Sequence, residues 1–116
     1  MIVRRWTGAV PHEKADAYLS LMRRVAIPDY RRTAGNIAAL CLHADRGDHV
    51  EVEMLTCWKD MDAVRAFAGA ETQLAKYYDF DADYLISLPR EVTHAEVEAA
   101  SFDAAALMTC ANGMPS

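Results

Sequence analysis

The sequence predicts an α+β fold in which two helices cover one face of a four-stranded antiparallel sheet. Three observations support this prediction. Strand-like runs of apolar or alternating residues occur at four places, a long amphipathic segment follows the first run, and a shorter one follows the third. The chain has 116 residues, of which 53% are hydrophobic, and this suffices for one ordinary domain with its own core.

The first strand and the first helix occupy the N-terminal part of the chain. Residues 2–10 are rich in β-branched side chains, and their alternation sends Arg4 and Trp6 to the same face. Pro11 is a favoured first helical residue. Pro28 is expected to end or bend the helix, because proline lacks the amide donor. The helix itself is predicted by an apolar stripe at three- and four-residue spacing, formed by Ala15, Tyr18, Leu19, Met22, Val25 and Ala26.

A hairpin occupies the middle of the chain. Gly35-Asn36 forms a turn, residues 37–44 are apolar enough for a strand, and residues 45–48 have hairpin-turn chemistry. Residues 50–58 then return as an antiparallel strand. One face of that strand carries Val50, Val52, Met54, Thr56 and Trp58, and the other carries Glu51, Glu53, Leu55 and Cys57.

The second helix follows this hairpin. Asp60 is a plausible N-cap, and Gly69 is expected to break the helix. Residues 74–78 suggest another turn or two of helix, and residues 79–83 read as a polar loop. The apolar side of the second helix is formed by Met61, Val64, Phe67 and Ala68.

The C-terminal part holds the last strand and a tail. Residues 84–86 form a short ordered piece, and the alternation over 92–97 predicts the last strand. The alanine-rich residues 99–116 are expected to form a weak helix or a loosely held arm, so the predicted domain covers 1–98.

The order strand, helix, strand, strand, helix, strand is the ferredoxin-like split βαβ arrangement. Two helices on one face of the sheet leave the other face in need of cover. Apolar side chains are available on either face of residues 50–58, so the sequence predicts a homodimer in which two sheets pair through their faces.

Charge and composition exclude several classes of partner. The net charge of -5 and the pI near 5.2 argue against nucleic acid and against an anionic membrane surface. No apolar run approaches the ~20 residues that a membrane span needs. The N-terminus lacks the long apolar core of a signal peptide, so we expect a cytoplasmic protein.

Neither cysteine nor histidine predicts a metal site. Cys41, Cys57 and Cys110 are not spaced as metal ligands, and a small buried hydrophobe is the commoner role of a free cysteine. The four histidines are scattered along the chain. We therefore expect no metal site.

Short motifs along nearly the whole chain, the tail excepted, point to a known family. They are found, in order and with matching spacing, at residues 2–8, 18–19, 28–30, 35–36, 58–63, 67–69, 75–78, 83–85 and 92–97. With these motifs the chain resembles the antibiotic biosynthesis monooxygenase family, a group of dimeric α/β barrels.

The resemblance implies a homodimer with a pocket between the sheet and the helices of each subunit. The best-understood members of that family oxidise polyketide phenols to quinones with dioxygen and no cofactor, and others open haem. The haem-degrading members use an axial histidine in the second helical region, but residues 60–78 contain none. Haem is therefore not expected here.

Three residues are candidates for catalysis, and each has a structural alternative. Arg4 and Arg5 fall on opposite faces of the strand, and the sequence leaves open which of them faces the pocket. Arg4 is expected to stabilise a phenolate or enolate if it faces inward, and otherwise to be a solvated or salt-bridged surface arginine. His94 lies two residues before Glu96 and is a candidate general base, or a structural histidine at the dimer interface. Trp58 is expected to donate its indole N–H to a substrate oxygen or to anchor the core.

Five further residues are candidates for substrate binding: Trp6, His43, Phe67, Tyr77 and Tyr78. Tyrosine hydroxyls can orient an aromatic substrate, or they can close the open end of the core with the hydroxyl facing outward.

Two functional hypotheses follow. One is a cofactor-independent monooxygenase acting on a small aromatic or enolisable substrate, and the other is a non-catalytic dimeric ligand-binding or stress-associated protein. An isomerase or a decarboxylase of small cyclic acids is a third class that the same fold accommodates.

Overall fold

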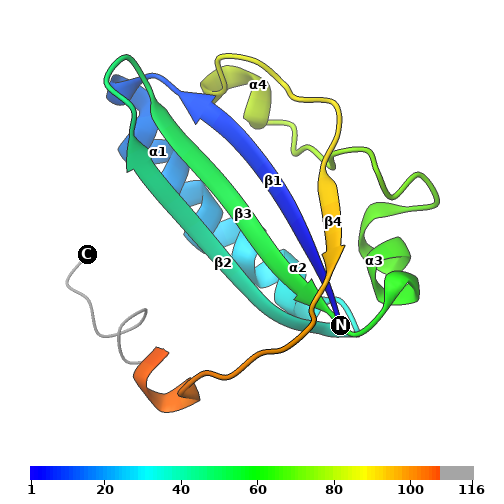
Figure 1. The fold of residues 1–116 in the computed structure, drawn as a ribbon. Helices are drawn as coiled ribbons and strands as arrows, with labels where there is room; N and C mark the ends of the chain where they lie inside the picture. Colours follow the sequence, from blue (N-terminus) through cyan, green and yellow to red (C-terminus); the bar gives the residue numbers. More distant parts are fainter. Residues whose placement is uncertain (108–116) are drawn as a thin grey trace.

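Four strands form one antiparallel sheet in the computed structural model, which describes residues 1–107 (Figure 1). The strands are β1 (Ile2–Val10), β2 (Asn36–Asp45), β3 (Val50–Trp58) and β4 (Thr93–Glu96), in the order β2-β3-β1-β4. This is the strand order of the ferredoxin-like fold, so the predicted fold class is confirmed.

The register of the sheet decides which side chains share a face. Arg4 lies opposite Thr56 and Trp6 lies opposite Met54, while Arg4 on its other side pairs with His94 of β4. Cross-strand partners point to the same face. The predicted alternation is therefore confirmed, and the even-numbered residues of β3 are buried against the helices.

One long helical segment packs on this face (Figure 1). It consists of α1 (His12–Leu21), the π-helical stretch η1 (Met22–Ala26) and α2 (Ile27–Arg32). Pro28 was expected to end or bend the helix, and the structure shows that the helix does not end there. The wider π turns come immediately before Pro28, where the amide of Ile27 donates to the carbonyl of Met22, and they accommodate a residue that has no amide donor.

Helix α3 (Met61–Ala68) has the predicted start and end. The Asp60 side chain accepts a hydrogen bond of 2.9 Å from the amide of Ala63, and Gly69 ends the helix with a φ of 89°. The apolar side of α3 packs on Trp58 in a small core cluster formed by Trp58, Ala63, Val64 and Phe67.

Two predictions for the segment after α3 are wrong. Residues 74–78 are not helical, because the backbone is held extended by a bridge between Leu74 and Glu91. The stretch 79–83 is not an open polar loop, because it contains the start of α4 (Asp81–Tyr84), and Asp81 is buried.

The other face of the sheet carries no helix, as Figure 1 shows for the side that faces the viewer. Leu40 and Leu55, which pair across β2 and β3, are partly exposed there, and Leu42 is 42% exposed. Cys57 lies on this face as well, and Cys41 packs against the main core. Both thiols are free, whereas Cys110 lies outside the described residues.

The described part of the chain after β4 runs away from the sheet, and its last residues, 104–107, form a helical turn (Figure 1). Every described side chain from 98 to 107 is exposed. Among residues 1–107, no helix has both the length and the apolar character required to cross a bilayer.

Candidate functional site

A cavity lies between the helix-covered face of the sheet and the segment that joins α3 to β4. Its volume is about 30 Å³. Strand β1 contributes Arg4 and Trp6 to its wall, and the long helix and the 67–92 segment contribute most of the rest. The polar groups of the wall are Arg4, Tyr18, Tyr30, Lys76, Tyr77, Tyr78 and Asp81.

Arg4 is the cationic centre of the cavity. Its side chain is buried, with the residue only 4% exposed, and it donates to the backbone carbonyls of Thr72 and, at 2.9 Å, Leu74. These bonds tie the 70–76 segment to the sheet. Burial lowers the pKa of Arg4 from its ordinary value, but a guanidinium keeps its charge at neutral pH. The neighbouring Arg5 points to the open face and pairs with Glu53 at 2.8 Å, which settles which of the two arginines faces inward.

His94 is bound to Arg4 and not to Glu96. The Nη1 atom of Arg4 lies 3.2 Å from Nε2 of His94. A guanidinium can only donate, so Nε2 must accept and the imidazole proton sits on Nδ1. Partial burial and the positive charge of Arg4 both lower the pKa of His94 below 6.5. His94 is therefore a neutral partner of Arg4 whose one lone pair is already engaged.

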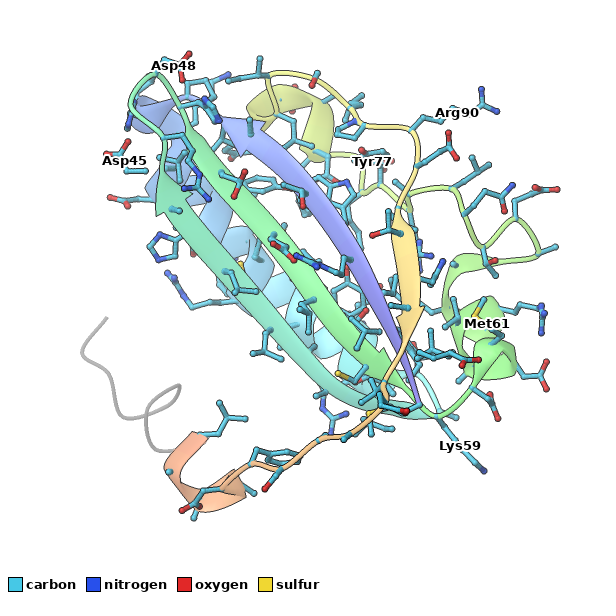
Figure 2. The ribbon with its side chains drawn as sticks, in the orientation of Figure 1. Asp45, Asp48, Lys59, Met61, Tyr77 and Arg90 are labelled. Atoms are coloured by element: carbon cyan, nitrogen blue, oxygen red, sulfur yellow. The ribbon has the colours of Figure 1, made fainter. Side chains whose placement is uncertain are left out.

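Trp6 and Tyr77 close the cavity on the side of β1. The Trp6 indole donates to the Tyr77 hydroxyl at 3.1 Å, and that hydroxyl donates to the carbonyl of Pro89. Figure 2 shows Tyr77 on the segment alongside β1. A Cβ at Gly8 would come within 2.4 Å of the Trp6 ring, so only glycine leaves room for this arrangement.

Tyr78 and Lys76 form the outer wall of the cavity. The Tyr78 hydroxyl donates to Asp29 at 2.6 Å, and the Lys76 ammonium lies 3.6 Å from the same carboxylate and 4.2 Å above the Phe67 ring. Burial raises the pKa of Asp29, but the bond from Tyr78 and the charge of Lys76 outweigh it and hold that pKa below its usual value. Asp29 therefore fastens the wall to helix α2 as a carboxylate.

Asp81 and Tyr18 lie on the inner wall. Asp81 is 3% exposed. It accepts a hydrogen bond of 2.8 Å from the Tyr18 hydroxyl and one of 2.7 Å from the amide of Tyr78. Burial raises the pKa of Asp81 above its ordinary value, although both hydrogen bonds act in the opposite direction. Desolvation and the adjacent carboxylate raise the pKa of Tyr18 strongly, so Tyr18 remains a neutral donor.

Tyr30 links the cavity to the small aromatic cluster. Its ring lies 4.7 Å from Phe67 and 6.4 Å from Trp58 between centroids. Burial raises its pKa to about 12, although the charge of Arg4 acts in the opposite direction. Its hydroxyl is thus a neutral phenol close to a fixed cation.

Trp58 does not line the cavity. It is fully buried, and its indole N–H donates to the Thr56 hydroxyl at 2.8 Å. Trp58 is therefore placed as a core anchor that holds α3 on the sheet. Its single N–H donor is used and cannot bind a ligand.

His43 also lies away from the cavity. It lines a second hollow of about 160 Å³, together with Leu42, Ala44, Arg46, Glu51 and Glu53. This hollow is larger, but both of its glutamates are paired, Glu51 with Arg46 at 2.9 Å and Glu53 with Arg5. The cavity wall, in contrast, holds the buried charges of Arg4 and Asp81, so we place the candidate site there.

The structure thus brings together six of the eight predicted residues: Arg4, Trp6, Phe67, Tyr77 and Tyr78 line the cavity, and His94 contacts Arg4. Sequence reasoning missed Asp81, Tyr18, Tyr30 and Lys76. Tyr18 was recognisable as the polar-tipped member of an apolar helical stripe. Asp81, one of three acids in five residues, carried no signal that separated it from its solvent-facing neighbours.

Comparisons with known proteins give a likeness of fold. No family model and no curated protein matches the sequence. A solved structure from Nitrosomonas europaea, provisionally assigned as an antibiotic biosynthesis monooxygenase, superposes with a TM-score of 0.63 at 19% identity, over 85% of this chain and 100% of that one.

Two further solved structures agree with the first. A Bacillus cereus protein with the same provisional assignment superposes with a TM-score of 0.59 at 18% identity, over 86% of this chain and 97% of its own. A Shewanella oneidensis protein gives a TM-score of 0.61 at 20% identity, over 81% and 89% of the two chains. The resemblance predicted from the sequence is therefore confirmed as a shared fold.

Proposed function

We propose that the protein is a cofactor-independent monooxygenase that oxidises a small aromatic or enolisable substrate with dioxygen. The observation that carries the proposal is the buried Arg4 on the cavity wall. Of its five N–H donors, three have acceptors among residues 1–107, namely Thr72, Leu74 and His94. Two remain to bind a substrate oxygen.

The surroundings of Arg4 suit the stabilisation of a substrate anion. Phenolate and enolate oxygens are stabilised by fixed donors in a site of low dielectric, where each charge-assisted bond is stronger than in water. The neutral state of His94 leaves the Arg4 charge uncompensated. The electron-rich anion then reacts with dioxygen. Overall, a methylene group of the substrate becomes a carbonyl group, one oxygen atom of dioxygen enters the product, and the other leaves as water with the two methylene hydrogens.

A substrate needs more room than the described cavity offers. About 10–15 Å³ of such space holds one water, so 30 Å³ holds roughly two. An aromatic ring enters, in this proposal, when the Lys76–Tyr78 wall moves outward. That wall depends on the contacts of Lys76 and Tyr78 with Asp29, and both are partly accessible to solvent.

Oxygen uptake tests the proposal. The protein is mixed with a panel of hydroquinones and anthrones, and oxygen consumption is followed with an electrode while the product is identified by mass. We expect uptake above the buffer rate for at least one substrate, and a loss of about 10²-fold or more in Arg4→Met. Arg5→Met, which removes the outward-facing neighbour, is the matched control and should retain the wild-type rate. Uptake at the buffer rate with every substrate contradicts the proposal.

The small volume of the cavity favours a second candidate, a non-catalytic binding protein on the same fold. In that case an aromatic ligand binds to the wild-type protein with measurable heat, yet no member of the panel is oxidised. Calorimetry and oxygen uptake on the same ligands separate the two candidates.

A further inference from the structure

We propose that Asp81 is the proton acceptor of the cavity and that Arg4 receives the oxygen of the same substrate. The substrate is then a carbonyl compound with an acidic C–H group. This inference rests on the proposed function for its oxidative half only, because enolisation itself needs no dioxygen.

The distribution of buried charge supports the roles of Asp81 and Arg4. Arg4 and Asp81 are the only charged residues among residues 1–107 that are buried, at 4% and 3% exposure, and both line the cavity. Neither has an ion-pair partner within the described part of the chain, and they do not pair with each other. An unpaired buried charge is costly, and such charges are concentrated at functional sites.

The hydrogen bonds of Asp81 support it as well. Its Oδ1 accepts from Tyr18 and its Oδ2 accepts from the amide of Tyr78, and both donors are neutral. A carboxylate offers about four acceptor positions, so two lone pairs remain. The carboxylate is thus fixed in orientation but not neutralised, which is what a general base requires.

The other candidate bases are engaged or lie outside the cavity. The sequence suggests His94, but its lone pair accepts from Arg4, and no histidine contributes to the cavity wall within residues 1–107. Asp29 contacts Tyr78 and Lys76 and is not part of the wall. Asp81 is the carboxylate that remains.

The proposed step conserves atoms and electrons. The substrate carbonyl oxygen accepts from the two unused N–H groups of Arg4, and Asp81 removes a proton from the acidic carbon. The C–H electron pair forms the enolate C=C bond, and the carbonyl π pair moves to the oxygen at Arg4. In the oxidative half, the carbanion adds dioxygen, Asp81 returns its proton to the peroxide, and loss of water leaves the ketone.

Deuterium exchange tests this step without any oxidation. Anthrone is incubated with the protein in deuterated buffer under argon, and the loss of its methylene signal is followed by NMR. We expect the wild-type protein to exchange faster than buffer, and Asp81→Asn to lose about 10²-fold or more of that acceleration. Asp83→Asn, an exposed carboxylate on the same short helix, should exchange like the wild type.

A pH profile of the wild-type protein guards against a variant that fails to fold. The exchange rate should rise with pH through one ionisation above the ordinary aspartate value, because burial raises the pKa of Asp81. The other titratable groups of the cavity wall are Arg4, Lys76 and the four tyrosines, and Asp29 and His94 lie next to them. The pKa of His94 is lowered from 6.5, so the profile is repeated in His94→Gln, in which the rise should persist. Burial raises the pKa of each of these tyrosines, so they stay protonated in this range.

The outcomes separate this inference from the proposed function. Exchange that depends on Asp81, without oxygen uptake, supports Asp81 as the proton acceptor and contradicts the proposed oxidation. Oxygen uptake together with exchange that is unchanged in folded Asp81→Asn overturns the inference and leaves the oxidation. A wild-type protein that does not accelerate exchange, or a rate that does not rise with pH, also overturns it.

Discussion

At the scale of single residues, the cavity depends on which side chains lose their water. Alternation along β1 placed Arg4 and Trp6 on one face, and this much followed from the sequence. The partner of His94 did not, because Arg4 and His94 are 90 residues apart and meet only through the register of β1 and β4. Asp81 was unpredictable for the same reason, since its partner Tyr18 lies 63 residues away.

The buried carboxylate should cost stability. Folding raises the pKa of Asp81 above its unfolded value of 3.8. Its contribution to stability is therefore complete below that value and is lost as the pH rises through the folded pKa. Asp81→Asn should raise the free energy of unfolding by about 1 kcal/mol at pH 7 and change it little near pH 3. Urea denaturation at both pH values measures this, and a large loss of stability at pH 7 would show that the charge is structural.

The imidazole of His94 should make stability depend on pH in the opposite direction from Asp81. Its folded pKa lies below 6.5 because of burial and the charge of Arg4. The contribution of neutral His94 to the free energy of unfolding is fully present above pH 6.5. It is lost as the pH falls through the lower pKa of the folded state. NMR titration of the ring should show His94 ionising below pH 6.5, and Arg4→Met should move its pKa back upward. An unchanged titration in Arg4→Met would refute the contact.

At the scale of elements, local signals placed the ends of α3 and the hairpin correctly. They failed where a distant contact decides the backbone. Leu74, Ala75 and Tyr78 have helix-like spacing. The bonds from Arg4 and the bridge to Glu91 nevertheless hold this segment extended. Pro28 was expected to end or bend the helix. The helix does not end there, because the π-helical stretch Met22–Ala26, which local propensity does not signal, lets it continue.

The N-cap of α3 should contribute measurably to stability. Asp60→Ala removes the acceptor for the amide of Ala63, which should cost about 1 kcal/mol. Asp62→Ala is the matched control, since Asp62 forms an exposed pair with Arg65, and its loss should cost less than about 0.5 kcal/mol. Thermal unfolding of both variants measures the difference. Equal losses would mean that the cap contributes no more than a surface charge.

At the scale of the whole molecule, the fold followed from the order of elements, and the solved structures share it. We propose that the helix-free face of the sheet pairs with a second copy. Leu40, Leu42 and Leu55 are partly or largely exposed on that face, and removing such apolar side chains from water favours association.

Sedimentation at micromolar concentration tests the homodimer. A chain of 12.9 kDa should sediment as a species of twice that mass. Leu55→Lys, which puts a charge at the centre of the face, should shift the equilibrium toward the monomer, whereas Lys59→Leu, beyond the end of β3, should not. A wild-type protein that stays at 12.9 kDa would rule out the dimer.

Binding of ligands in the cavity beside Arg4 is the central claim, and an NMR titration with a redox-inert phenol such as 4-nitrophenol tests it most directly. We expect shifts at the Arg4 side chain and at the rings of Tyr30 and Tyr78, with Lys76 moving as the outer wall opens. Shifts confined to Leu42, His43 and Glu51 in the second hollow would contradict it.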